Sequence, residues 1–193
     1  MRIIGGEWRG RRISPPKGTA TRPTTDRVRE AVFSAIASRI GDDMGGGSVL
    51  DAFAGSGALG LEALSRGATS ATFVEAHRPT TAVIQSNIES LGATHRARVV
   101  ASDLFTVVAR AIPGAPFALI LLDPPYKLDA ARVSDALATL AQGGGIEDGA
   151  LVSWEHASED EVVWPEGFEP VASKRYGTTA VDMAVYEREP KEQ

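Results

Sequence analysis

The chain of 193 residues contains no cysteine, and aromatic residues make up only 6% of it. The absence of cysteine excludes a disulfide framework, a thiolate metal site and a cysteine nucleophile. No stretch approaches the roughly 18 apolar residues of a membrane-spanning helix, and the N-terminal residues lack the apolar core of a signal peptide. We therefore expect a cytoplasmic protein that does not bind membranes. The three histidines, His77, His95 and His156, share no spacing typical of metal ligands, so we also expect no metal.

Positive charge is concentrated at the N-terminal end of the chain. Residues 1–40 contain nine of the 20 basic side chains and only three of the 25 acidic ones, although the net charge of the chain is −5. A basic segment attached to an acidic body is typical of an arm that contacts phosphates, and solvated surface charge is the alternative interpretation.

The sequence pattern predicts two domains, with a boundary in the glycine-rich break over residues 42–47. Residues 1–41 are expected to form a small basic β-hairpin and a helix. In residues 42–193, short apolar strands alternate with helices, which predicts a mostly parallel sheet covered by helices on both faces. Residues 169–175 and 180–187 flank a short turn and predict an antiparallel hairpin at the C-terminal end. The other expected strands are 48–51, 71–75, 97–101, 117–122 and 150–154.

A glycine turn follows the first strand of the larger domain. Gly55, Gly57 and Gly60 spell GxGxxG, and Glu75 lies 20 residues after the first of them. Glycines let the backbone approach a ligand closely, and the helix that follows offers free N–H groups at its N-terminus. Because the pattern satisfies the dinucleotide-binding fingerprint, an NAD-dependent oxidoreductase is one interpretation.

The acids at the strand ends favour a different cofactor. Asp51, Glu75, Asp103 and Asp123 close four successive strands, at the sheet edge where open α/β folds bind ligands. Asp51 would repel a pyrophosphate, but it would attract the sulfonium and ammonium groups of S-adenosylmethionine. Glu75 is then placed to accept hydrogen bonds from the ribose hydroxyls, and Asp103 from the adenine amine. The expected cofactor-binding residues are Asp51, Phe53, Ala54, Gly55, Gly57, Gly60, Glu75, Ala76, Asp103, Leu104 and Asp123.

The tetrapeptide Asp123-Pro124-Pro125-Tyr126 follows the most apolar strand and predicts the catalytic site. The Asp123 carboxylate and the Pro124 carbonyl can each accept one N–H of an exocyclic amine, which positions the nitrogen for in-line methyl transfer. Tyr126 offers a ring on which an extruded base can stack, and Pro125 stiffens the loop. Methylation of cytosine at C5 usually requires a thiolate, so the absence of cysteine favours methylation of an amine.

These motifs resemble those of the bacterial small-subunit ribosomal RNA guanine-N2 methyltransferases of the RsmD type. The matching segments are 2–6, 8–11, 22–30, 50–60, 123–126 and 174–177, and together they extend over nearly the whole chain. The resemblance implies a class I, Rossmann-like methyltransferase fold with seven strands and S-adenosylmethionine as methyl donor. It also implies a guanine of small-subunit ribosomal RNA as target, within an assembled ribosomal particle. We expect a monomer whose RNA contacts are Arg9, Arg11, Arg12, Arg22, Thr24, Arg27 and Lys127.

Two other functions share parts of this pattern. A DNA amino-methyltransferase of the adenine-N6 or cytosine-N4 type would have the same core motifs, and a non-catalytic RNA-binding module would need only the basic segment. The sequence departs from the resemblance in a run of acidic residues near its end. These are Glu155, Glu159, Asp160 and Glu161, and we expect that face not to hold RNA.

Overall fold

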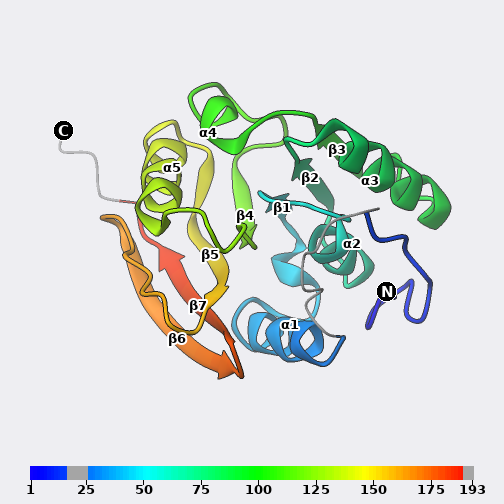
Figure 1. The fold of residues 1–193 in the computed structure, drawn as a ribbon, viewed down its shortest axis with the longest axis horizontal. Coiled ribbons are helices and arrows are strands. Elements are labelled where there is room, and N and C mark those ends of the chain that lie inside the picture. The colour runs from blue at the N-terminus through cyan, green and yellow to red at the C-terminus, as the bar shows by residue number, and fades with distance from the viewer. Residues whose placement is uncertain (17–25, 189–193) are drawn as a thin grey trace.

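The computed structural model describes residues 1–16 and 26–188. Within these residues seven strands form one sheet in the order β3-β2-β1-β4-β5-β7-β6 (Figure 1). Strands β1 to β5 pair in parallel, and β7 runs antiparallel to both β5 and β6. The strands are β1 (Ser48–Asp51), β2 (Ser70–Val74), β3 (Ala97–Val100), β4 (Phe117–Leu122), β5 (Ile146–Ala157), β6 (Phe168–Tyr176) and β7 (Thr179–Tyr186).

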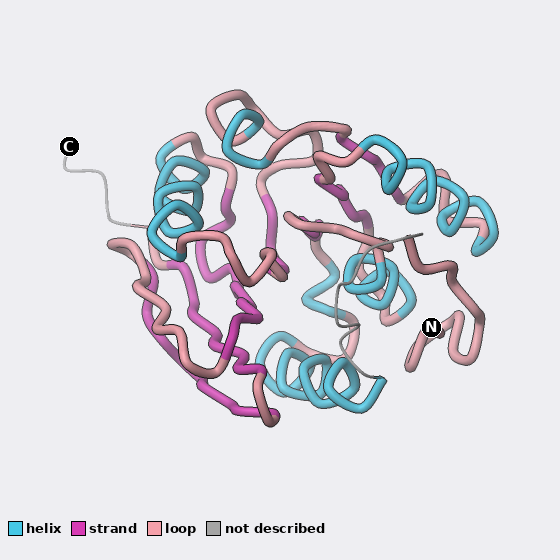
Figure 2. Tube along the Cα trace, viewed as in Figure 1, coloured by secondary structure: helices cyan, strands magenta, loops and turns pink. Residues whose placement is uncertain are grey.

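Helices cover both faces of this sheet (Figure 2). They are α1 (Asp26–Ile40), α2 (Ala58–Ser65), α3 (Arg78–Leu91), α4 (Leu104–Val107) and α5 (Ala130–Gln142), with a short 3-10 helix, η1 (Met44–Gly46). Buried side chains of α1, α2 and α3 form one apolar cluster, and those of α4 and α5 form another on the opposite face. None of the helices in the described parts of the chain combines the length and apolar character needed to span a membrane.

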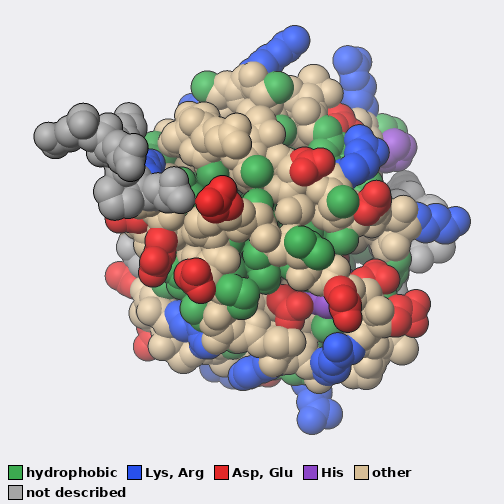
Figure 3. Space-filling view, turned by 90° about the vertical axis from the view of Figure 1, so that its left-hand side faces the viewer, with side chains coloured by type: hydrophobic (Ala, Val, Ile, Leu, Met, Phe, Trp, Pro, Cys, Tyr) green, Lys and Arg blue, Asp and Glu red, His purple; other side chains and the backbone are tan. Residues whose placement is uncertain are grey.

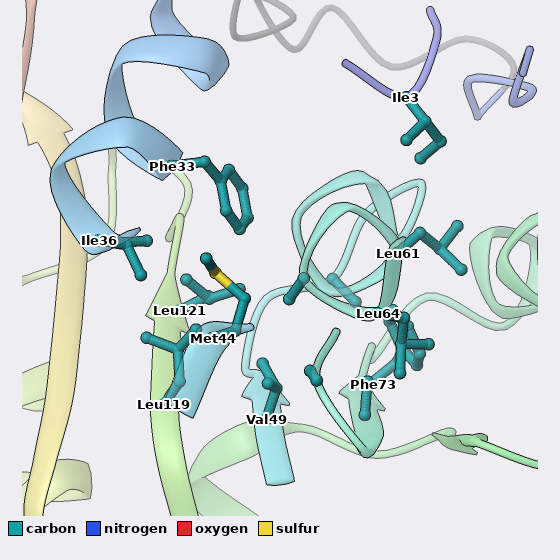
Figure 4. Close-up of a cluster of buried hydrophobic side chains, with 14 of the residues drawn as sticks. Ile3, Phe33, Ile36, Met44, Val49, Leu61, Leu64, Phe73, Leu119 and Leu121 are labelled. Carbon is teal, nitrogen blue, oxygen red and sulfur yellow. The ribbon is translucent and has the colours of Figure 1, made fainter. Parts of the chain in front are cut away.

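The continuously apolar sequence of strand β4 is explained by its burial on both faces of the sheet. Leu119 and Leu121 belong to the cluster below α1 and α2, whereas Ile120 and Leu122 belong to the cluster below α4 and α5. Successive side chains of a strand point to opposite faces, so a central strand covered on both sides has no solvent-facing positions. Figure 4 shows Leu119 and Leu121 beside Met44, among other side chains of the first cluster.

The mostly parallel sheet and its antiparallel C-terminal hairpin are confirmed. Strand β5 is longer than expected at both ends, because Ile146 pairs with Phe117 of β4 and residues Leu151 to Ala157 pair with β7. At the N-terminal end the chain turns back on itself, but the pairing there is an isolated antiparallel bridge between Arg2 and Arg12.

The N-terminal segment is held against α2 by a buried carboxylate. Glu62 has no exposed surface, and it accepts hydrogen bonds from the backbone N–H groups of Ile4 and Gly5, both at 2.8 Å. It also accepts a hydrogen bond of 2.8 Å from Arg66 Nε, and Arg29 Nε lies 3.9 Å away. A buried charge with several donors is well compensated, so this contact fixes the segment to the helix that follows the glycine turn.

Candidate active site

Three of the expected site residues meet at one edge of the sheet because their strands are neighbours. Strand β1 lies between β2 and β4, and parallel strands place their carboxyl ends on the same side. Asp51 ends β1, Glu75 follows β2, and Asp123 follows β4. The turn after β1 is held between these strands, since Ala52 N–H donates to Leu121 and Ala54 N–H donates to Val74, both at 3.0 Å.

The three glycines of the turn serve different purposes. Gly57 caps α2 with a φ of +80°, and Gly55 has a φ of +53°, so both occupy the left-handed region that favours glycine. A Cβ atom on Gly55 would meet nothing within 4 Å, which leaves the backbone there open to a ligand. A Cβ atom on Gly60 would instead come within 2.4 Å of the Phe73 ring. Gly60 therefore permits close packing of α2 on β2.

Asp51 is a buried carboxyl with one unmatched oxygen. The residue is 1% exposed, and its Oδ2 accepts a hydrogen bond of 2.8 Å from the Gly60 backbone. Its Oδ1 is buried without a hydrogen-bond partner among the described residues. Burial raises the pKa of Asp51 to about 7; the Gly60 hydrogen bond opposes this rise and the charge of Glu75 adds to it. An oxygen of this kind is suited to a polar cationic ligand.

The carboxylate of Glu75 is oriented by backbone donors. Gly55 N–H donates to Oε2 at 3.0 Å, and His77 N–H donates to Oε1 at 2.8 Å. Glu75 is partly buried, and the adjacent Ala76 is exposed. Because each carboxylate oxygen can accept more than one hydrogen bond, the group can hold a polyol while it keeps these two contacts.

Asp103 begins a short aromatic wall. It is exposed and caps α4 by accepting a hydrogen bond of 2.8 Å from Phe105 N–H, while Leu104 is buried. The Phe105 and Phe53 rings are tilted, with centroids 6.3 Å apart, and the Arg132 guanidinium lies 4.2 Å from the Phe105 ring centroid. Arg132 could not be anticipated from the sequence, because its contact with Phe105 joins α5 to α4.

The tetrapeptide forms the loop between β4 and α5. Asp123 is partly buried and Pro124 is buried, whereas Pro125 is exposed and Tyr126 is 50% exposed. The pKa of Asp123 is raised well above its usual value, first by burial and then by the charges of Glu155 and Asp51. Glu155 was not among the expected site residues. The effect of Glu155 on the pKa of Asp123 could have been anticipated only from the pairing of β5 with β4.

A hollow lies beside the tetrapeptide. Trp154 and His156 of β5 contribute to its wall, and His156 Nε2 lies 3.1 Å from Asp182 Oδ2. The hollow is open to solvent and combines aromatic, aliphatic and acidic side chains. Its lining consists of Pro124, Pro125, Tyr126, Leu128, Ala130, Val133, Trp154, His156, Ala157, Asp160, Glu161 and Val162.

The expected RNA contacts are on the surface where they are described. Arg9, Arg11, Arg12 and Arg27 are exposed on the N-terminal segment and α1, and Lys127 is exposed directly after the tetrapeptide. Arg22 and Thr24 lie outside the described residues. No group of three or more histidine and acidic side chains within residues 1–16 and 26–188 is arranged to hold a metal ion.

Comparisons with known proteins agree with this geometry. A family model with the description "Conserved hypothetical protein 95" matches residues 1–185. The chain is 41% identical, over 160 residues, to the Escherichia coli protein named Ribosomal RNA small subunit methyltransferase D, covering 83% of this chain and 76% of that protein. The structure of Escherichia coli yhhF matches with a TM-score of 0.81 and 38% identity, over 97% of this chain and 98% of that one.

A more distant solved structure has the same fold. It is an RNA methyltransferase from Salinibacter ruber in complex with S-adenosyl-L-homocysteine. Its TM-score is 0.63 at 16% identity, over 88% of this chain and 97% of that one.

Proposed function

This chain belongs to the family described as Conserved hypothetical protein 95, and on that premise we propose that it methylates the exocyclic N2 amine of a guanine in small-subunit ribosomal RNA. Its fold is that of class I S-adenosylmethionine-dependent methyltransferases, and its 41% identity to Ribosomal RNA small subunit methyltransferase D identifies a ribosomal RNA methyltransferase. The choice of guanine N2, and of an assembled small subunit as the substrate, belongs to the proposal.

The residues at the sheet edge fit S-adenosylmethionine. The buried, unmatched Oδ1 of Asp51 suits a cationic group, the open backbone at Gly55 lets a ligand approach, and the oriented Glu75 carboxylate suits ribose hydroxyls. We assign the adenine to the wall formed by Phe53, Asp103 and Phe105. When bound, S-adenosylmethionine supplies a methyl group on an electrophilic sulfonium.

The single observation that carries the proposal is the position of the tetrapeptide beside the glycine turn. Strand β4 pairs with β1, so Asp123 and Pro124 lie next to the turn that follows Asp51. Two acceptors at this point can bind both N–H groups of one amine and hold its nitrogen in place. Positioning contributes much of the rate in an in-line displacement, and the exposed ring of Tyr126 can stack on the base.

Asp123 also suits the removal of a proton. An amine that gains a methyl group must lose one N–H proton. The Asp123 carboxylate already accepts a hydrogen bond from this N–H, so it is in position to take the proton. Burial and the neighbouring acids raise the pKa of Asp123, which makes it a better proton acceptor than a solvated aspartate. We infer that Asp123 first orients the amine and then takes its proton.

We propose that residues 1–41 are an RNA-contacting extension and that residues 42–193 are the methyltransferase domain. The exposed positions of Arg9, Arg11, Arg12 and Arg27 support this assignment, and Lys127 adds a charge next to the catalytic loop. We further propose a monomeric, metal-independent enzyme of the cytoplasm. Sedimentation of the enzyme alone and activity in the presence of a chelator test the first two properties.

The test measures transfer of a labelled methyl group to four acceptors: unmethylated small ribosomal subunits, their free RNA, duplex DNA and single-stranded DNA. We expect label on the subunits that digestion identifies as N2-methylguanosine. Asp123→Asn, which keeps the size of the side chain, should abolish transfer while binding of S-adenosylmethionine persists. Label on DNA alone would instead support an amino-methyltransferase acting on adenine or cytosine, and 5-methylcytosine as product would contradict amine methylation.

A further inference from the structure

Two acidic residues line the hollow beside the tetrapeptide. Asp160 and Glu161 line it together with Pro124, Pro125 and Tyr126. Both acids follow the end of β5, the strand that pairs with β4, which explains why they reach the catalytic loop. Neither carboxylate forms an ion pair with any of the described residues. They are therefore available to a ligand.

The turn that carries these acids is held by the C-terminal hairpin. Ser158 N–H donates to the Thr178 carbonyl at 3.0 Å, and Arg175 Nη1 donates to the Ser158 carbonyl. Asp160 N–H closes the turn on the Ala157 carbonyl at 3.0 Å. Arg175 and Thr178 of the C-terminal hairpin, which the catalytic chemistry does not use, thus fix the backbone just before Asp160 and Glu161.

Carboxylates at this position distinguish guanine from the other bases that carry an exocyclic amine. In guanine the ring nitrogen N1, next to the N2 amine, carries a hydrogen and is a donor. In adenine and cytosine the ring nitrogen at the corresponding position, N1 or N3, carries a lone pair and is an acceptor. A carboxylate accepts only, so it stabilises guanine beside the catalytic loop and repels the lone pair of adenine or cytosine.

We propose that one carboxylate of the pair Asp160 and Glu161 selects guanine by accepting the N1–H of the target base while Asp123 and Pro124 hold its N2 amine. The inference rests on the proposed function, because it places the methylated amine at the tetrapeptide. It adds a substrate-binding role for residues outside the methyltransferase motifs, and it disfavours adenine-N6 and cytosine-N4 methylation.

The acidic surroundings are compatible with this role. Figure 3 shows several acidic side chains, interspersed with hydrophobic and basic ones, on the side of the molecule that carries α5 and β6. The charges of Asp160 and Glu161 repel the phosphates of a bound strand, so we expect the RNA backbone to stay clear of the hollow. A single extruded base brings only its ring into the hollow, so the same charges can recognise the base while the backbone stays outside.

The test uses two RNAs that are identical except at the target position, where one has guanine and the other has 2-aminopurine. 2-Aminopurine keeps the N2 amine but has a lone pair at N1. Each RNA is assembled into small subunits, and kcat/KM for methyl transfer is measured with the wild type, Asp160→Asn, Glu161→Gln and the double variant. Glu159→Gln is the matched control, because Glu159 is exposed in the same turn but does not line the hollow.

We expect the wild type to favour guanine by roughly 10- to 100-fold, the range of a hydrogen bond to a charged group. The double variant should lose most of this preference, chiefly through a lower kcat/KM for guanine, and Glu159→Gln should keep it. An equal loss of kcat/KM for both RNAs, or an unchanged preference, would overturn the inference while leaving guanine methylation intact. No methylation of guanine by the wild type would overturn the proposed function itself.

A second readout separates base recognition from damage to the fold. The fluorescence of 2-aminopurine reports its extrusion and stacking without any methyl transfer. The carboxylate variants should bind this RNA at least as well as the wild type, since removing the negative charge relieves repulsion of the N1 lone pair. Weaker binding of the 2-aminopurine RNA by both single variants would contradict the proposed contact.

Discussion

Asp51 and Gly60 are joined across the glycine turn by a hydrogen bond of 2.8 Å from the Gly60 N–H to Asp51 Oδ2. This bond ties the end of β1 to the first turns of α2, and it leaves Asp51 Oδ1 buried without a hydrogen-bond partner in the described part of the chain. Burial raises the pKa of Asp51 to about 7, so a cation or a change in pH can determine its charge.

The binding of S-adenosylmethionine should depend on pH through Asp51. Asp51 is neutral below a pH of about 7 and ionised above it, so its attraction for a sulfonium and an ammonium group grows with pH. We expect the affinity for S-adenosylmethionine to rise about tenfold between pH 6 and 8, and to rise much less in Asp51→Asn. Isothermal titration calorimetry across this pH range measures the affinity of the wild type and of Asp51→Asn. Parallel plots of affinity against pH for the two proteins would contradict the role of Asp51 in binding the cation.

Removal of the same charge should change the stability of the cofactor-free protein. Between the unfolded pKa of 3.8 and the folded pKa of about 7, the folded state binds a proton that the unfolded state does not. The stabilisation of the folded state by this bound proton is therefore lost as pH rises towards 7. The free energy of unfolding of Asp51→Asn relative to the wild type should increase by about 2 kcal/mol from pH 5 to 7. Denaturant titrations at several pH values test this, and a pH-independent difference would count against it.

Gly60→Ala should destabilise the fold. The added Cβ would lie 2.4 Å from Cε1 of the fully buried Phe73 ring, and a packed core yields little at such a contact. We expect a loss of about 1–3 kcal/mol in the free energy of unfolding. Phe73→Leu in the same chain should recover part of this loss by making room. If the free-energy losses of Gly60→Ala and Phe73→Leu simply add in the double variant, the contact between the new Cβ and the Phe73 ring is not the cause of the destabilisation.

Glu62→Gln should release the N-terminal segment. The variant replaces a buried carboxylate that accepts hydrogen bonds from Ile4, Gly5 and Arg66, and it leaves the Arg66 guanidinium without its charged partner. We expect a loss of about 3 kcal/mol and faster trypsin cleavage in the segment. Glu30→Gln, at an exposed position of α1, is the control and should behave like the wild type in both assays.

Replacement of Arg9, Arg11 and Arg12 by alanine should weaken RNA binding and flatten its salt dependence. Each lost phosphate contact reduces the slope of log K against log salt by about 0.7 for single-stranded RNA. The measurement is RNA affinity at several salt concentrations. The single changes Arg12→Ala and Arg110→Ala form a matched pair of exposed arginines, and only the first should alter the slope. An unchanged slope in the triple variant would refute an RNA-contacting arm.

The sequence by itself determined the order of most strands and helices, although it did not determine the length of β5 or the isolated Arg2–Arg12 bridge at the N-terminal end. The apolar run of β4 and the GxGxxG turn are local patterns, set by burial on two faces and by backbone freedom. Asp51, Glu75 and Asp123 follow such segments directly, so their place at the carboxyl edge could be predicted. The antiparallel C-terminal hairpin was predictable for the same reason, because its turn joins neighbouring segments.

Only the tertiary structure decided how these pieces meet. The strand order places β1 between β2 and β4 and places β5 beside β4, which brings Glu155 close enough to raise the pKa of Asp123. The packing of Arg132 on Phe105, and the turn that presents Asp160 and Glu161 beside Tyr126, likewise join residues distant in the chain. Such contacts depend on how whole elements pack and on what they exclude from water, and neither property is encoded in any one segment.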